Sequence, residues 1–131
     1  DLLERNRDVF RFFKMMIALR KRHPSIGRSR FWREDIHWYG TGAHVDWGPE
    51  SSQLAYCLDG ASQSDRDLYV MINGGDTAAT FTLQEEGPGE WQRVIDTGRP
   101  SPDDIVDERR APTLGSPDYL VGARSVVVLV R

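Results

Sequence analysis

The sequence DLLERNRDVFRFFKMMIALRKRHP, residues 1–24, decides the fold, because it predicts one long helix in front of a chain that otherwise indicates strands and turns. At about 100° per residue, its apolar side chains cover an arc of roughly 240°, far wider than the apolar stripe of a surface helix. These side chains are Leu2, Leu3, Val9, Phe10, Phe12, Phe13, Met15, Met16, Ile17 and Leu19. Pro24 is expected to end the helix and to push His23 out of the helical region. So wide an apolar arc predicts that the helix packs between two separate parts of a protein. The strands that follow supply one of them, and the chain is therefore interpreted as the end of a larger protein.

The composition narrows the class of protein. A chain of 131 residues is long enough to bury a hydrophobic core without stabilising metal sites or disulfide bonds. Its single cysteine, Cys57, excludes an internal disulfide and favours a reducing compartment, so we predict cytoplasmic residence. Arg11, Lys14 and Arg20 interrupt the apolar face of the helix, so no membrane-spanning segment or secretion signal is predicted.

The charge balance argues against nucleic acid as a partner, because 17 basic and 20 acidic residues give a net charge of −3. Basic residues do cluster between Arg20 and Arg33, at the predicted end of the helix. Cations suit the helix dipole and solvent there, and we favour that interpretation over a phosphate-binding role.

After Pro24 the periodicity changes to short alternating segments bounded by Gly, Pro, Asn and Asp, which is typical of antiparallel sheet. The clearest hairpin is predicted from Asp67 to Leu83, with its turn at residues 73–76. Residues 97–118 carry no periodic pattern and are interpreted as a surface excursion. Strands are predicted at residues 29–32, 35–39, 54–58, 68–72, 79–83, 91–96, 119–121 and 125–130. The predicted fold is mainly β: an antiparallel β-sandwich preceded by one long N-terminal α-helix.

The aromatic residues offer two interpretations, core packing and a sugar-binding platform. Trp32, Trp38 and Trp91 fall on predicted strands beside other apolar residues, and we expect them in the core. Trp47 lies in a predicted loop and is the best candidate for an exposed aromatic residue. Trp47 and Tyr39 are therefore the candidate substrate-binding residues.

The sequence predicts no catalytic residue, metal site or cofactor in this chain. His37, His44 and Asp46 match no recurrent spacing of zinc ligands. Acidic pairs such as Asp103-Asp104 and Asp107-Glu108 are interpreted as solvated turns, because neighbouring carboxylates on a strand point apart. His23 follows the last helical turn and is assigned capping or an interaction with the helix dipole. Nucleophile elbows and phosphate-cradling glycine loops are absent.

Several separate motifs resemble the C-terminal end of bacterial glycogen debranching enzymes of the isoamylase type, in the α-amylase superfamily. They are FFKMMIALRKRHPSI, RFW, DIHWYG, VDWGPESSQLAYCLDG, LYVMINGG, FTL, WQRVIDTG and YLVGARSVVVLV, in this order over nearly the entire chain. The resemblance implies that residues 1–24 are the last helix of a catalytic (β/α)8 barrel and that residues 25–131 are the β-sandwich domain behind it. It also implies that the catalytic carboxylates lie in the barrel, outside this chain.

The resemblance implies a non-catalytic role within a hydrolase of α-1,6-glucosidic branch linkages in glycogen: structural support of the barrel. The predicted interdomain helix face consists of Phe10, Phe12, Phe13, Met16, Ile17 and Leu19. The expected partners are the barrel of the same polypeptide and, through the parent enzyme, glycogen or another branched glucan. Two alternatives stay open, an independent carbohydrate-binding module and an interaction domain that dimerises through its helix. Without the barrel, the chain is expected to self-associate.

Overall fold

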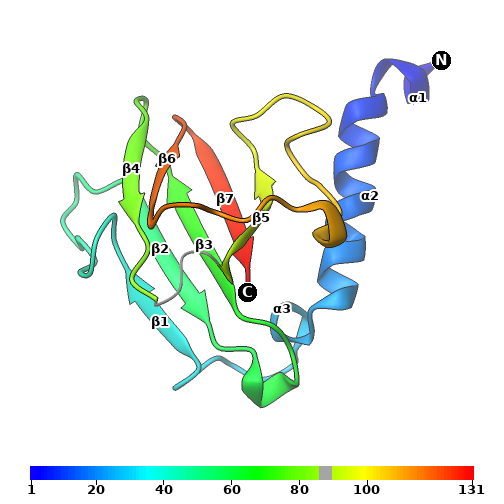
Figure 1. Cartoon of the computed structure of the whole chain (residues 1–131). Helices are drawn as coiled ribbons and strands as arrows, with labels where there is room; N and C mark the ends of the chain where they lie inside the picture. Colours follow the sequence, from blue (N-terminus) through cyan, green and yellow to red (C-terminus); the bar gives the residue numbers. More distant parts are fainter. Residues whose placement is uncertain (86–89) are drawn as a thin grey trace.

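The computed structural model describes residues 1–85 and 90–131, and it is mainly β with antiparallel sheets behind an N-terminal helix, as the sequence predicts (Figure 1). A five-stranded sheet has the order β1-β2-β3-β7-β5, and a two-stranded sheet pairs β4 with β6. The helices are α1 (Leu2–Arg5), α2 (Arg7–Arg22) and α3 (Pro24–Gly27), with 3-10 turns η1 (Ala61–Gln63) and η3 (Glu108–Arg110). The strands are β1 (Ile36–Tyr39), β2 (Gln53–Leu58), β3 (Leu68–Asn73), β4 (Ala79–Thr82), β5 (Gln92–Asp96), β6 (Asp118–Val121) and β7 (Ser125–Val130).

Strand β3 is central in the large sheet, and its two faces carry two separate cores. Val70 pairs with Tyr56 of β2 and Val128 of β7, and these residues belong to the cluster that also contains Leu19 of α2. The alternate residue Met71 belongs to the cluster shared with the small sheet. Because side chains alternate across a strand, the apolar run of β3 serves a helix on one side and a sheet on the other.

The predicted hairpin from Asp67 to Leu83 is wrong, because β3 pairs with β2 and β7 while β4 crosses to the other sheet and pairs with β6. The buried side chain of Asn73, at the end of β3, directs this crossing. Its Nδ2 donates to the carbonyl oxygens of Val121 and Gly122, at 3.2 and 3.0 Å, and its Oδ1 accepts from the N–H of Gly75 at 3.0 Å. These bonds hold the connection against the turn between β6 and β7.

The N-terminal helix is not continuous. It breaks at Asn6, and α2 ends at Arg22. His23 is extended (φ −108°, ψ 95°), which confirms the expected effect of the following proline. Pro24 does not simply end the helical region, however: it begins the short α3, since proline suits the first position of a helix.

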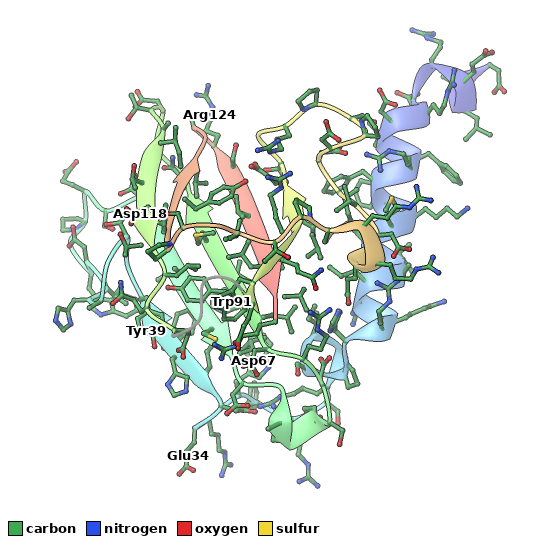
Figure 2. All side chains as sticks on the ribbon, in the orientation of Figure 1. Glu34, Tyr39, Asp67, Trp91, Asp118 and Arg124 are labelled. Atoms are coloured by element: carbon green, nitrogen blue, oxygen red, sulfur yellow. The ribbon has the colours of Figure 1, made fainter. Side chains whose placement is uncertain are left out.

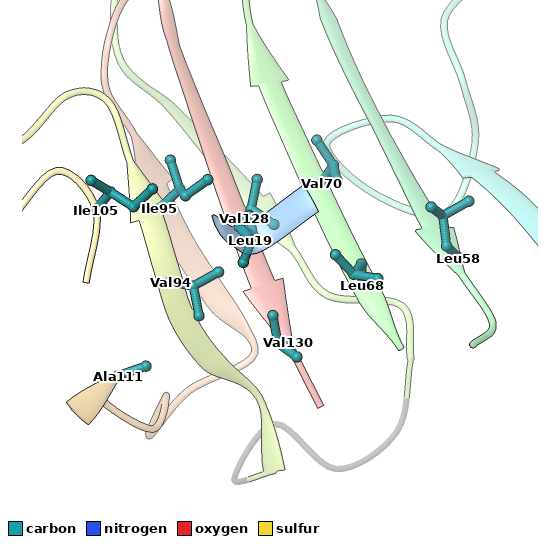
Figure 3. Close-up of a cluster of buried hydrophobic side chains, with 10 residues drawn as sticks. All are labelled: Leu19, Leu58, Leu68, Val70, Val94, Ile95, Ile105, Ala111, Val128 and Val130. Atoms are coloured by element: carbon teal, nitrogen blue, oxygen red, sulfur yellow. The ribbon is translucent and has the colours of Figure 1, made fainter. Parts of the chain in front are cut away.

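The region of residues 97–118 is more than a surface excursion. Ile105 is buried and forms an isolated β-bridge with Ile95 of β5, and both belong to the core under α2 (Figure 3). Strand β5 itself shifts register between Arg93 and Ile95, and this irregularity explains its imperfect alternation. The segment at residues 29–32, predicted as a strand, lies in a loop instead.

The three tryptophans expected in the core do not share one environment. Trp91 is completely buried inside the sandwich (Figure 2), as expected. The expectation is wrong for Trp32 and Trp38, which are 39% and 46% exposed. Trp32 lies in the loop before β1, and Trp38 lies on the edge strand β1, where only Tyr56 of β2 forms a ring pair with it among the described residues.

Candidate functional site: the exposed face of helix α2

One side of α2 is part of the sandwich core. Leu19 is buried among side chains of β3, β5 and β7 (Figure 3), and Phe12 and Met15 pack half-buried against the same cluster. The three positions are spaced three and four residues apart, so they lie on one face of the helix. This face of α2 therefore packs on the five-stranded sheet, which is the one partner that the chain itself provides.

A second side of α2 carries large apolar side chains that the described part of the chain leaves exposed. Their exposed fractions range from 36% for Met16 to 64% for Phe13. The members of this exposed face are Val9, Phe10, Phe13, Met16 and Ile17. The six residues predicted as an interdomain face therefore divide: Phe10, Phe13, Met16 and Ile17 lie on the exposed face, and Phe12 and Leu19 lie toward the sheet.

Charged groups fix the orientation of α2 on the sandwich. Arg11 forms an ion pair with Asp104, and its guanidinium also donates to Ser101 Oγ at 3.2 Å and to the carbonyl oxygen of Ile105 at 3.1 Å. One side of the helix is thus held by the segment at residues 101–105. The interpretation of Asp104 as part of a solvated turn is wrong.

The C-terminal end of α2 is held by a buried charge cluster around His23. Its Nδ1 lies 2.8 Å from Asp65 Oδ1, and its Nε2 forms a short contact with Glu108 Oε1. Glu108 also pairs with Arg22 and Arg66, each at 3.2 Å. Burial raises the pKa of Asp65, but the N–H of Ser25 and the ring of His23 outweigh that effect and lower this pKa below its usual range.

His23 does cap α2, because its N–H donates to the carbonyl oxygen of Leu19 at 3.1 Å. The sequence does not reveal that its side chain is buried in this cluster, and the interpretation of Glu108 as part of a solvated turn is wrong because its side chain is buried. His23 is 42 residues from Asp65 and 85 from Glu108, so no short-range spacing signals the contact.

The candidate substrate-binding residues lie in different settings. Trp47 is 76% exposed in the connection between β1 and β2. Tyr39 stacks its ring on Tyr69, with centroids 5.9 Å apart, and its hydroxyl donates to Glu85 at 2.8 Å. Burial raises the pKa of Tyr39, and the hydrogen bond to Glu85 raises it further. One face of the Tyr39 ring is therefore occupied by the core.

Residues 1–85 and 90–131 contain no group of three or more His, Cys, Asp or Glu side chains placed to hold a metal ion. No helix in the same ranges has the length and hydropathy needed to cross a bilayer.

The family described as isoamylase 1-3, C-terminal, matches residues 37–118. The chain belongs to this family. The resemblance to isoamylase-type debranching enzymes is thereby confirmed.

Relatives of this isoamylase C-terminal domain include isoamylase 3, chloroplastic, of Oryza sativa subsp. japonica, which is 35% identical over 134 residues. That match covers 98% of the chain and 16% of the relative. The isoamylase of Flavobacterium sp is 29% identical over 140 residues, covering 91% of the chain and 18% of the relative. The chain thus spans less than a fifth of the length of either relative.

Solved structures show that the fold recurs in pullulanases. The pullulanase from Bacillus acidopullulyticus aligns with a TM-score of 0.69 at 21% identity, over 98% of the chain and 14% of that protein. The type I pullulanase from Bacillus subtilis str. 168, solved with maltose, also gives 0.69, at 16% identity over 98% of the chain and 16% of that protein. In both, the matched part is again a small share of a longer enzyme.

Proposed function

We propose that this chain is the non-catalytic C-terminal domain of an enzyme that hydrolyses α-1,6-glucosidic branch linkages, and that it supports the catalytic domain through the exposed face of α2. The observation that carries the proposal is the two-sided apolar surface of α2. Its sheet side is buried, while large apolar side chains on its other side face solvent.

Exposure of this size favours a partner. Burying one large apolar side chain contributes roughly 1.5–3 kcal/mol, so the exposed face offers several times that amount to a complementary surface. A monomer seldom leaves contiguous apolar side chains exposed without an interaction. Because ion pairs fix α2 to the sandwich, a domain docked on the exposed face would be held in one orientation.

The nature of the parent enzyme rests on the relatives, which carry the names of isoamylases and are five or more times longer than this chain. We place the catalytic carboxylates in a barrel domain of the same polypeptide and take glycogen or a similar branched glucan as the substrate. Cytoplasmic residence stays a prediction from the single cysteine, and the plant relatives are named chloroplastic.

A carbohydrate-binding module is the second candidate, and exposed aromatic rings favour it. Trp47 is largely exposed, and Trp38 is half-exposed with its ring centroid 5.4 Å from that of Tyr56. Against the predicted pair of Trp47 and Tyr39, the ring of Tyr39 is stacked on Tyr69 and its hydroxyl is bonded. The third candidate, a dimerisation domain, would use the same face of α2 as the catalytic domain.

The test uses the parent enzyme with Ile17→Asp on the exposed face, matched by Lys14→Asp on the charged side of the same helix. Calorimetry and the release of reducing ends from glycogen are measured for both. We expect Ile17→Asp to separate the unfolding of the two domains and to lower the thermal stability of activity, because it places a charge in the interface. Equal behaviour of the two variants would show that the exposed face does not contact the catalytic domain.

A further inference from the structure

A cavity of about 730 Å³ lies beside the C-terminal end of α2, between the helix and the loop of residues 28–35. Its walls are strongly basic and include Arg20, Lys21, Arg28 and Arg30, together with Ser29. The volume is in the range of sites that hold small organic ligands. Ile17 lines one end, so the cavity borders the exposed face of α2.

The loop that forms one wall is organised from within. The guanidinium of Arg28 donates to the carbonyl oxygens of Arg30 and Phe31, at 3.1 and 3.0 Å, and forms an ion pair with Asp35. Asp35 also accepts from the N–H of Arg33 at 3.0 Å. The guanidinium of Arg28, and to a lesser extent this N–H, hold the pKa of Asp35 far below its usual range. Arg28 is thus neutralised inside the loop and fixes its shape.

The remaining cations of the wall are not neutralised in this way. Within residues 1–85 and 90–131, no acidic oxygen lies at ion-pair distance from Arg20, Lys21 or Arg30. The same ranges pair other arginines, such as Arg11 and Arg131, with carboxylates. Three unpaired cations around one cavity, in a chain of net charge −3, create a local positive field that attracts an anion.

The donor set favours a phosphoryl group over a simple carboxylate. A phosphate monoester presents three strong acceptor oxygens that share a charge of about −1.5 to −2 at pH 7, and guanidinium forks bind such groups with paired, charge-assisted hydrogen bonds. The Ser29 hydroxyl supplies a neutral partner, and the ring of Phe31, which is 93% exposed, lies on the same loop and in the wall of the adjoining cavity. An apolar ring beside cations suits a sugar that carries a phosphate ester.

Contrary to the interpretation that the sequence favours for these basic residues, we propose that this cavity binds the phosphoryl group of a phosphorylated α-glucan. The glucan as the carrier rests on the proposed function, whereas the preference for a phosphoryl group rests only on the cavity. A glucan bound there would lie at the edge of the exposed face of α2. The site would therefore tether phosphorylated chains next to the catalytic domain without taking part in bond cleavage.

The test is a titration of the ¹⁵N-labelled chain, followed by amide shifts at low salt. The ligands are inorganic phosphate, glucose 6-phosphate, glucose, and maltooligosaccharides with and without a phosphate ester. We expect both phosphate compounds to shift amides of residues 20–33, glucose to shift none, and the phosphorylated oligosaccharide to bind at least about tenfold tighter than its unphosphorylated counterpart.

Paired variants separate the site from general charge. Arg20→Gln with Arg30→Gln is expected to weaken phosphorylated oligosaccharide binding about tenfold or more, because two charge-assisted contacts are lost. Lys14→Gln with Arg110→Gln removes the same charge elsewhere and is expected to leave binding unchanged.

Two results would overturn the proposal: equal affinity in both double variants, or an oligoglutamate peptide that binds as tightly as the phosphorylated oligosaccharide, which would indicate a protein segment as the ligand. The titration is made in a Phe13→Glu background, so that association of the exposed face does not contribute, and it does not measure debranching activity. Its failure is therefore distinguishable from failure of the proposed function.

Discussion

Replacing Leu19 by alanine tests the packing of α2 on the large sheet. Leu19 is only 6% exposed and belongs to the cluster formed with β3, β5 and β7. Leucine-to-alanine changes in cores cost about 2–5 kcal/mol, depending on how far the cavity closes. Phe12 and Met15 beside it are only half-buried and can relax toward the space, so we expect about 2–3 kcal/mol. Urea unfolding followed by tryptophan fluorescence measures this loss, because unfolding exposes the completely buried Trp91 to water.

The matched control is Ile17→Ala, which deletes the same number of carbon atoms from the exposed face of the same helix. Ile17 is 55% exposed, and we expect a loss within about 0.5 kcal/mol. Both variants are measured in a Phe13→Glu background so that association of the exposed face does not contribute. If the two substitutions destabilise the chain equally, α2 does not pack on the sheet through Leu19 and the division of its faces is refuted.

Three further predictions concern the isolated chain. It self-associates through the exposed face, and Phe13→Glu restores a monomer in light scattering while Lys14→Glu does not; a monomeric wild-type chain would contradict this. Burial raises the pKa of the Cys57 thiol from 9.0 to about 12. Only the unfolded chain then ionises this thiol between those values, so the free energy of unfolding falls there relative to Cys57→Ala, by up to about 1.4 kcal/mol per pH unit; identical pH profiles in urea titrations would refute it. The chain releases no reducing ends from glycogen or pullulan and binds linear maltooligosaccharides weakly, so micromolar binding lost in Trp47→Ala would favour the carbohydrate-binding alternative.

Periodicity predicted most elements of the fold, because their signals are local. The alternation at residues 54–58 and the β-branched run at residues 125–130 correspond to β2 and β7. Which strands pair with one another was harder to predict from the sequence. The turn residues after Asn73 favoured a hairpin, yet the hydrogen bonds of Asn73 to Val121 and Gly122 divert the chain into the other sheet. Those partners lie 48 and 49 residues away in sequence, beyond the reach of any turn signal.

The environment of Trp38 shows the same limit for side chains. Alternation places Trp38 and Ile36 on one face of β1, and this can be predicted from the sequence of the strand alone. Whether the face is covered depends on where α2 lies. Leu19 lies with side chains of β3, β5 and β7, whereas β1 is an edge strand, and Trp38 remains half-exposed (Figures 1 and 3).

The width of the apolar arc was visible in the sequence, but the line that divides it between two partners was not. That line follows from contacts of α2 with segments far along the chain, chiefly Arg11 with Asp104 and His23 with Glu108. Rotation of α2 about its axis would break the ion pair of the partly buried Asp104 and the contact of the buried Glu108 with His23, so it is opposed at both ends. Helix α2 and the strands share one core through Leu19. The domain boundary between residues 24 and 25 stays a prediction. A domain docked on the exposed face would take its orientation from the sandwich rather than from the helix alone.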